Sequence, residues 1–411
     1  MRKKMPQDNP DDLSRLFIGA VLTLGCSFQL PAHAAPGDPF NVIVGTSLRY
    51  EDNLFRLSPS IDPLLAVGKA QRSDWVSSTY AGIRVDKPYS LQRFQLDATV
   101  TANRYDAFSY LNHTQNEYRG AWLWSITPRL TGVLSSEQQQ FAASYADFRN
   151  FTTRNIQTNQ VHRATADWLV GGGLHVLGGV TETRSKNTAS FTAVGDFTLS
   201  TVHAGVKYVN AAGNSVTVEH RSSDGEYNGR AIDPVLVFDN KFKQNETDAE
   251  VRWQLSAHSL VIGKLGYLER THQNFGARNF DGGVGRLAYI WTPTDKLSFN
   301  LAAGHTLYSF QELSNSYYTL DYLTLTPTWA VTPKTNVKLK LDVSRRHFKG
   351  AVVPVAALRQ ETIRSAQLSA EWAVTRTATI AGFFNVDDRS SNFSAFEYRA
   401  NSAGVTAQLK F

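Results

Sequence analysis

Histidine, serine and acidic side chains are the residues of this 411-residue chain that could perform chemistry, and their spacing matches no common catalytic motif. The sequence contains no G-x-S-x-G, P-loop, H-E-x-x-H or C-x-x-C motif. Its ten histidines are scattered, with no pair four residues apart in a helical context. We therefore expect no catalytic residue, no cofactor, no metal ligand and no enzymatic activity.

Two smaller groups of residues leave alternatives open. His175 and His203 fall on the polar face of alternating segments. A Ser–His hydrolase site, of the kind found in outer-membrane lipases, is one interpretation, and a solvated histidine is the simpler one. Asp387 and Asp388 could bind a cation, although an acidic pair in solvent explains them as well.

The segments that carry these side chains alternate between apolar and polar residues. In the last ten residues, Ser402–Phe411, the apolar positions are Val405, Ala407, Leu409 and Phe411, and the polar positions between them are Thr406, Gln408 and Lys410. This pattern is typical of a strand with one face in an apolar medium and the other in water. Similar alternation recurs in residues 93–101, 248–255, 337–344 and 366–372.

Short turn signals divide the chain at a regular spacing. They occur near Pro88, Pro128, Gly172, Gly213, Ala257, Thr294, Lys334 and Arg376, with 37 to 44 residues from one to the next. Each interval holds two long alternating segments and a longer polar loop, whereas propeller repeats of similar length hold four short strands. The eight turns join sixteen strands, and a first strand at 42–50 and a closing strand at 402–411 bring the count to about eighteen.

This pattern predicts an all-β fold, a single transmembrane antiparallel up-and-down β-barrel over residues 35–411, with both termini on the periplasmic side. Because a barrel avoids an open edge only by pairing its last strand with its first, we expect 402–411 to pair with 42–50. The mean hydropathy of −0.29 is compatible, since lipid-facing and lumen-facing residues cancel in a sliding window. The alternation is weaker in residues 76–85 and 260–270. Pro327 falls inside a segment, where it should remove a ladder bond or mark a bulge.

Residues 1–34 are predicted to be a cleaved signal peptide. A basic start at Arg2-Lys3-Lys4 and an apolar stretch at 16–25 precede an A-x-A cleavage site at Ala32-His33-Ala34. The single cysteine, Cys26, lies in this segment, so the mature chain has no thiol chemistry. The segment also holds four of the 42 basic and three of the 36 acidic residues, which leaves a net charge of +5 spread along the mature chain and no indication of nucleic-acid binding.

These features predict the outer membrane of a Gram-negative bacterium, with outer-membrane lipid, lipopolysaccharide and the barrel-assembly machinery as partners. Six tryptophans stand two to four residues before a tight turn and are expected to form a periplasmic aromatic belt: Trp124, Trp168, Trp253, Trp291, Trp329 and Trp372. Core tryptophans of a soluble protein would have no reason to recur at one height of the repeat. The terminal Phe411 resembles the residue that the assembly machinery reads in outer-membrane barrels.

Charged residues on the polar face are expected to line an aqueous lumen and to tune passage electrostatically. They are Arg93, Asp97, Arg163, Asp167, Glu250, Arg252, Lys338, Lys340 and Asp342. The longer loops are expected at the outer side. Some mix aromatic, amide and basic residues that suit sugar rings, as in 227–230 and 147–151, although ordinary loop packing is an equal alternative.

Two stretches resemble the outer-membrane barrel family of exopolysaccharide loci, often labelled EpsL. They are Tyr50-Glu51-Asp52-Asn53-Leu54-Phe55-Arg56 and the loop at 147–155. The resemblance implies a role in exopolysaccharide secretion, with exopolysaccharide and a periplasmic polysaccharide-export protein as partners. It supplies no catalytic residues.

The leading hypothesis is therefore a passive pore that exports exopolysaccharide, since barrels of 16 to 18 strands leave an aqueous lumen. A surface barrel that binds and anchors polysaccharide, a general diffusion porin for small solutes, and an outer-membrane enzyme are the alternatives. Deleting the gene should trap polymer in the periplasm if the protein exports it, and should shed polymer into the medium if the protein anchors it. Polysaccharide should be unaffected if the protein is a porin.

Overall fold

The computed structural model describes residues 39–147, 149–189 and 195–411, most of which lie in eighteen long β-strands. The predicted signal peptide lies outside the described residues. In chain order the strands are β1 (Phe40–Glu51), β2 (Asp74–Tyr89), β3 (Gln92–Tyr105), β4 (His113–Thr127), β5 (Leu130–Ala142), β6 (Ile156–Gly171), β7 (Leu174–Asn187), β8 (Phe197–Val209), β9 (Ser215–Tyr227), β10 (Lys241–Ser256), β11 (Ser259–His272), β12 (Phe280–Thr294), β13 (Leu297–Glu312), β14 (Asn315–Thr332), β15 (Thr335–Lys349), β16 (Gln360–Ala373), β17 (Ala378–Ser391) and β18 (Tyr398–Lys410).

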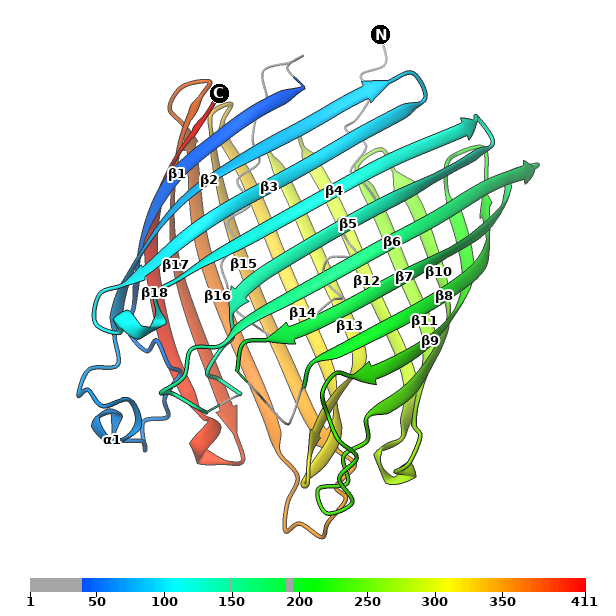
Figure 1. Ribbon diagram of the computed structural model, residues 1–411. Helices are drawn as coiled ribbons and strands as arrows, with labels where there is room; N and C mark the ends of the chain where they lie inside the picture. Colours follow the sequence, from blue (N-terminus) through cyan, green and yellow to red (C-terminus); the bar gives the residue numbers. More distant parts are fainter. Residues whose placement is uncertain (1–38, 148, 190–194) are drawn as a thin grey trace.

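The strands form one closed antiparallel sheet in which each strand pairs with its neighbours in the chain (Figure 1). β18 returns to β1, in a register that runs from Ile43 opposite Lys410 to Glu51 opposite Ser402. Two more backbone hydrogen bonds, each 2.9 Å long, join Val42 and Phe411. The predicted fold, the strand number and the closure of the barrel by its first and last strands are confirmed.

Turns of two to five residues connect the strands at one end of the barrel, at all eight of the expected positions. The start of β1 at Phe40 and the C-terminus lie at this turn end (Figure 1). The turn chemistry is visible at Gly172 and Gly173, whose φ values of 60° and 81° lie in the left-handed region that glycine adopts without strain.

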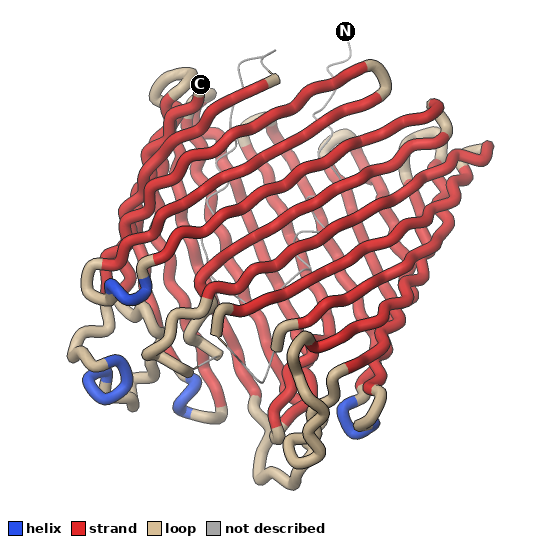
Figure 2. Tube along the Cα trace, in the orientation of Figure 1, coloured by secondary structure: helices blue, strands red, loops and turns tan. Residues whose placement is uncertain are grey.

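The longer connections lie at the opposite, loop end, together with the short helices (Figure 2). These are α1 (Pro63–Val67), η3 (Ser109–Leu111), η4 (Gly276–Arg278) and η5 (Ser394–Phe396). Helix α1 begins where the Asp62 carboxylate accepts a 2.9 Å hydrogen bond from Leu64 N–H, and it ends at Gly68. Several strands extend further than expected, for example β17 to Ser391, so the loops are shorter than the sequence pattern suggested.

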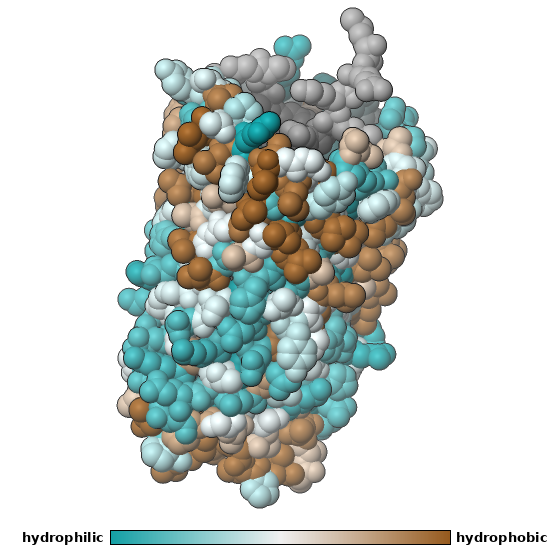
Figure 3. Space-filling model, turned by 90° about the vertical axis from the view of Figure 1, so that its right-hand side faces the viewer, coloured by the Kyte–Doolittle hydropathy of each residue, from teal (hydrophilic) through white to brown (hydrophobic). Residues whose placement is uncertain are grey.

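Side chains alternate across the barrel wall, as the sequence predicts. On β18, Val405 and Leu409 are 57% and 43% exposed on the outer face, whereas Thr406 and Lys410 point inward and are 9% and 7% exposed. On the face seen in Figure 3, apolar residues form a band nearer the turn end, a broad hydrophilic zone lies below it toward the loop end, and apolar residues appear again at the loop tips. An apolar outer band is what contact with lipid requires. Within the described ranges, no helix has the length and apolar content to span a membrane.

The segments with weak alternation are nevertheless regular strands, since residues 76–85 lie in β2 and residues 260–270 in β11. Pro327 lies inside β14 and is paired with Phe299 of β13 in an unbroken register. On its other side, the pairing with β15 skips from Leu325 to Thr328 without a change of register. Pro327 therefore removes ladder pairing and creates no bulge, because it lacks the N–H that the ladder needs.

Candidate functional site: the lumen and its mouth

Contacts across the ring identify the inner face of the wall. The loop between β5 and β6 places Asp147 against Arg346 of β15 and Arg389 of β17. Because β6 and β15 are nine strands apart in a ring of eighteen, this loop reaches the opposite wall through the interior. The even-numbered residues of β15 therefore face the lumen, and the cross-strand register carries this assignment around the barrel.

The structure places all nine charged residues singled out for the lumen on this inner face. Four of them are in ion pairs with their neighbours on the wall. Arg93 contacts Asp86 at 2.5 Å, and Asp97 contacts Arg84. Asp167 contacts His175 at 2.5 Å and also Lys207, while Glu250 contacts Arg286 at 2.6 Å.

The other five lumen candidates are not in ion pairs. Asp342 accepts a 2.5 Å hydrogen bond from the Thr324 hydroxyl. Lys338 and Lys340 are exposed to the lumen. Neither lysine, nor Arg163 or Arg252, lies within ion-pair distance of an acidic group among the described residues. The lumen wall thus offers several cations to a passing solute.

A larger charge network, which the sequence did not reveal, covers the inner wall from β8 to β11. Arg221 contacts Glu219 at 3.0 Å and also Asp248. Lys264 lies 3.0 Å from both Glu246 and Asp248. His203 lies 3.3 Å from Glu219. Both histidines singled out in the sequence are therefore beside carboxylates of the wall, and neither of these contacts involves a serine.

The six belt tryptophans lie near the turn end on the outer face. Five of them are 42–53% exposed: Trp168, Trp253, Trp291, Trp329 and Trp372. Trp124 is less exposed because its indole lies across Gly132 of the next strand, where an added Cβ would come within 2.3 Å of the ring. Phe411 lies at the same end and is 66% exposed. Trp75 is at the loop end instead, with its ring 5.1 Å from that of Tyr50.

Loop residues 143–147 and 149–155, which we call the strap, cross the mouth of the lumen at the loop end. Near β5 and β6, Tyr145 and Phe151 of the strap pack against Phe55 and Phe108 of the neighbouring loops. On the far side, Ala146 packs against β18 and accepts a hydrogen bond from Arg389. The strap is therefore attached to both walls, and no motif in the sequence indicated that it would fold inward.

The strap carries Asp147 into a buried group of charges that we call the clasp, made of Asp147, Arg149, Arg346, Arg359, Glu361 and Arg389. Arg346 donates to the two Asp147 oxygens at 3.2 and 3.1 Å, and Arg389 donates at 2.7 Å. The side chains of Asp147, Arg346 and Arg389 are at most 8% exposed. Burial acts to raise the pKa of Asp147, but the charges of Arg346, Arg389 and Arg359 outweigh it and hold the pKa well below the usual carboxyl range.

Aromatic and basic loop residues that suited sugar recognition are used inside the protein. Arg230 lies 3.9 Å above the Tyr227 ring and donates to Gln311 at 2.7 Å, and Tyr227 is only 4% exposed. The neighbouring Arg278 is fully buried and donates to main-chain oxygens of Leu236, Val237, Glu312 and Asn315. In the motif 227–230, the aromatic and basic side chains therefore pack within the protein, as the interpretation of ordinary loop packing expects.

Asp387 and Asp388 do not form an acidic pair, because successive residues of β17 point to opposite faces. Asp387 is fully buried on the inner side, 3.7 Å from Arg56, and Asp388 faces outward, 3.7 Å from Arg364. The expectation of an acidic pair or a cation site at these positions is wrong. In the part of the chain that the structure describes, no group of three His, Cys, Asp or Glu residues is placed to hold a metal ion.

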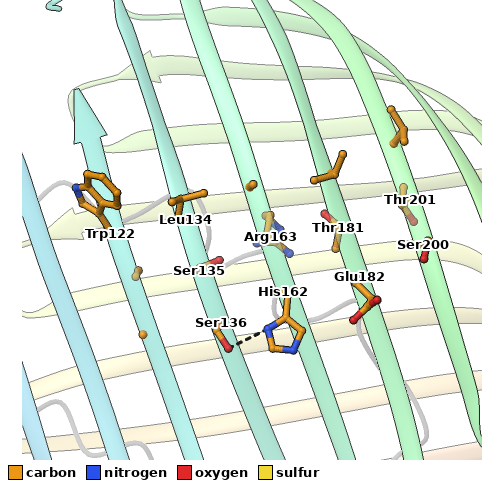
Figure 4. A pocket seen from close by; sticks show the side chains of 15 residues that line it. Trp122, Leu134, Ser135, Ser136, His162, Arg163, Thr181, Glu182, Ser200 and Thr201 are labelled. Carbon is orange, nitrogen blue, oxygen red and sulfur yellow. Dashed lines mark hydrogen bonds between the residues drawn. The ribbon is translucent and has the colours of Figure 1, made fainter. Parts of the chain in front are cut away.

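The outer wall between β4 and β8 carries an open pocket of about 750 Å³ (Figure 4). Within it, Ser136 and His162 are joined by a hydrogen bond of 3.0 Å between Oγ and Nδ1. Glu182 stands opposite His162 in the register, but its carboxylate contacts Arg184 at 2.8 Å. A serine nucleophile needs a base that a third group orients. No described residue bonds the second nitrogen of this imidazole, so the pair lacks that group.

The closed barrel, its apolar outer band and its polar inner face define a β-barrel with the fold of outer-membrane porins, in the outer membrane of a Gram-negative bacterium. Residues 245–411 match the family described as "Putative beta-barrel porin 2". The comparison with curated proteins finds no match.

Similar solved structures come from Pseudomonas aeruginosa. OccK9 (OpdG) has a TM-score of 0.52 at 9% identity, with 90% of this chain and 98% of that chain covered. OpdQ has a TM-score of 0.50 at 10% identity, with 90% and 97% covered, and OccK1 (OpdK) has 0.50 at 9%, with 90% and 99% covered. At these identities the likeness concerns the fold. These findings support a porin-like fold and do not show the resemblance to the family of exopolysaccharide loci.

Proposed function

We propose that this protein is a non-enzymatic diffusion channel for small hydrophilic solutes. The observation that carries the proposal is the polar, charged inner face of a barrel whose eighteen strands are wide enough to leave an aqueous lumen. The nine charged lumen residues would set which solutes pass. The exposed Lys338 and Lys340, without acidic partners among the described residues, favour small anions over small cations.

Exopolysaccharide export is the narrower hypothesis raised by the resemblance at residues 50–56 and 147–155. The strap disfavours it, because a hydrated glycan strand would have to break the buried clasp between Asp147, Arg346 and Arg389. The match of residues 245–411 to a porin family also favours diffusion of small solutes. Anchoring of polysaccharide at the surface has weaker support, because aromatic and basic side chains of both candidate sugar motifs pack within the protein: Arg230 over Tyr227 in one, and Phe151 against Phe55 and Arg149 over Phe396 in the other.

Three measurements test this proposal. Purified full-length protein in planar bilayers should give open-channel conductance. In liposome-swelling assays, entry should fall steeply as the sugar grows from a monosaccharide to an oligosaccharide. A deletion strain should secrete and retain surface polysaccharide normally. Polymer trapped in the periplasm of that strain would overturn the proposal in favour of export, and a barrel that conducts no ions would overturn both.

A further inference from the structure

The clasp contains more hydrogen-bond donors than its own acids accept. Five buried guanidinium nitrogens have no hydrogen-bond partner among the described residues: Nε and Nη2 of Arg149, Nε and Nη2 of Arg359, and Nε of Arg346. The four arginines face two carboxylates. Of these, Glu361 stands 3.4 to 3.6 Å from Arg346, Arg359 and Arg389, with no hydrogen bond to either oxygen. Buried donors without acceptors destabilise a protein, so this surplus needs a reason.

A neighbouring charge network at the mouth shows no such surplus of arginines over carboxylates. This network, on β1, the loop after it and β17, pairs Arg49 and Arg56 with Glu51 and Asp387, at contact distances of 2.9 to 3.7 Å. That network has two guanidinium groups for two carboxylates. Glu312 also acts on Arg359, but from beyond ion-pair distance.

We propose that the clasp is a binding site for a small oxyanion, a solute that carries a carboxylate or phosphate group, and that Asp147 occupies this site as an internal competitor. The Asp147 carboxylate already bridges Arg346 and Arg389 in the way that guanidinium groups bind oxyanions. A solute in its place can use the same donors. It can also reach the donors of Arg359 on the wall, which Asp147 leaves without a hydrogen bond, whereas Arg149 belongs to the strap and leaves with it.

Binding of the solute requires the strap to lift, because the clasp is almost fully buried while Asp147 is in place. The guanidinium carbon of Arg359 lies 3.7 Å from the ring centroid of Phe348 and 4.2 Å from that of Phe396. These two rings hold the guanidinium group in position when the strap leaves. The strap would then open the mouth for the class of solute that displaces it. The opening of the mouth rests on the proposed channel function. Binding of an anion to the clasp can be tested without it.

The test is isothermal titration of the full-length protein in detergent, with inorganic phosphate and separately with succinate. Asp147→Ala removes the competitor and should raise the apparent affinity. If the strap is closed 90–99% of the time, the gain is about ten- to a hundredfold. Adding Arg389→Gln to Asp147→Ala should abolish the gain. Asp224→Ala is the matched control, since its carboxylate is 78% exposed and forms only a 3.8 Å contact with Lys243. It should bind like the wild type.

Folding of every variant is checked by its heat-modifiable mobility on gels. If Asp147→Ala does not fold, Asp147→Asn keeps the size of the side chain, loses the charge, and should raise the affinity in the same direction. Binding of either phosphate or succinate supports the site. Equal affinities of wild type and both Asp147 variants, binding of neither anion, or a gain that survives Arg389→Gln would each overturn it. If the wild-type protein does not conduct ions, that result counts against the proposed function. It does not bear on the anion site, because the titration measures anion binding directly.

Discussion

The assignment of outer and inner faces can be tested at two adjacent residues, Leu368 and Ser369 of β16. Leu368 is 51% exposed on the outer face, midway between Trp372 near the turn end and Arg364 toward the loop end. Eight residues at about 3.3 Å each, tilted by about 40°, span roughly 20 Å of height, so Leu368 should lie near the middle of the lipid layer. Ser369 points into the lumen, opposite Lys338 and Phe383.

Leu368→Arg places a charge in lipid and should destabilise the barrel by about 2–4 kcal/mol, which is roughly a thirtyfold to several-hundredfold change in the unfolding equilibrium. Ser369→Arg places the same side chain in lumen water, where repulsion by Lys338 is screened and the cost should stay below about 1 kcal/mol. Guanidinium unfolding of both variants in phospholipid vesicles measures the difference. Equal losses, or a larger loss for Ser369→Arg, would refute the assignment of the two faces.

Three other predictions concern the loops and the belt. The pKa of Asp147 is held low by Arg346, Arg389 and Arg359 in spite of burial, so the stabilisation by the clasp is present above the ordinary carboxyl pKa of about 4 and is lost only as pH falls well below it. Conductance should therefore be unchanged between pH 7 and pH 5. A conductance that rises as the pH is lowered from 7 to 5 would contradict an ionised Asp147 that holds the strap closed. Gly132→Ala should cost about 1–3 kcal/mol in thermal unfolding, because a Cβ there meets both the Trp124 ring and Thr165 O, and an unchanged stability would show that Trp124 does not lie across this glycine. Arg278→Ala leaves four main-chain oxygens without their donor. Arg278→Lys cannot restore these hydrogen bonds, because an ammonium group lacks the planar set of donors of the guanidinium group. Limited proteolysis should then cut the loop between β9 and β10 faster in both variants, and wild-type resistance in Arg278→Ala would refute this role.

The wall of the barrel was predictable because its information is local. Alternation with a period of two needs only neighbouring residues, and it correctly gave the faces of Val405 and Thr406 and the closure of β18 on β1. Turn residues such as Gly172 and Gly173 report their own backbone conformation. Where the pattern faded, in residues 76–85 and 260–270, the closed ring still imposed strands, because each needs both neighbours to satisfy its backbone hydrogen bonds.

The mouth was not predictable in this way. The sequence placed Asp147 and Tyr227 on outer loops, and only the tertiary structure turned them inward, against partners up to 242 residues away along the chain. Asp387 and Asp388, neighbours in sequence, were separated to opposite faces of β17 by the same alternation that made the wall predictable. The sequence by itself determined a barrel, its strand number and its lipid face, because those follow from the period of the strand. The diameter of the closed ring and desolvation in its interior decide which loops cross the lumen and which charges meet there. No local stretch of the sequence encodes that diameter or that desolvation.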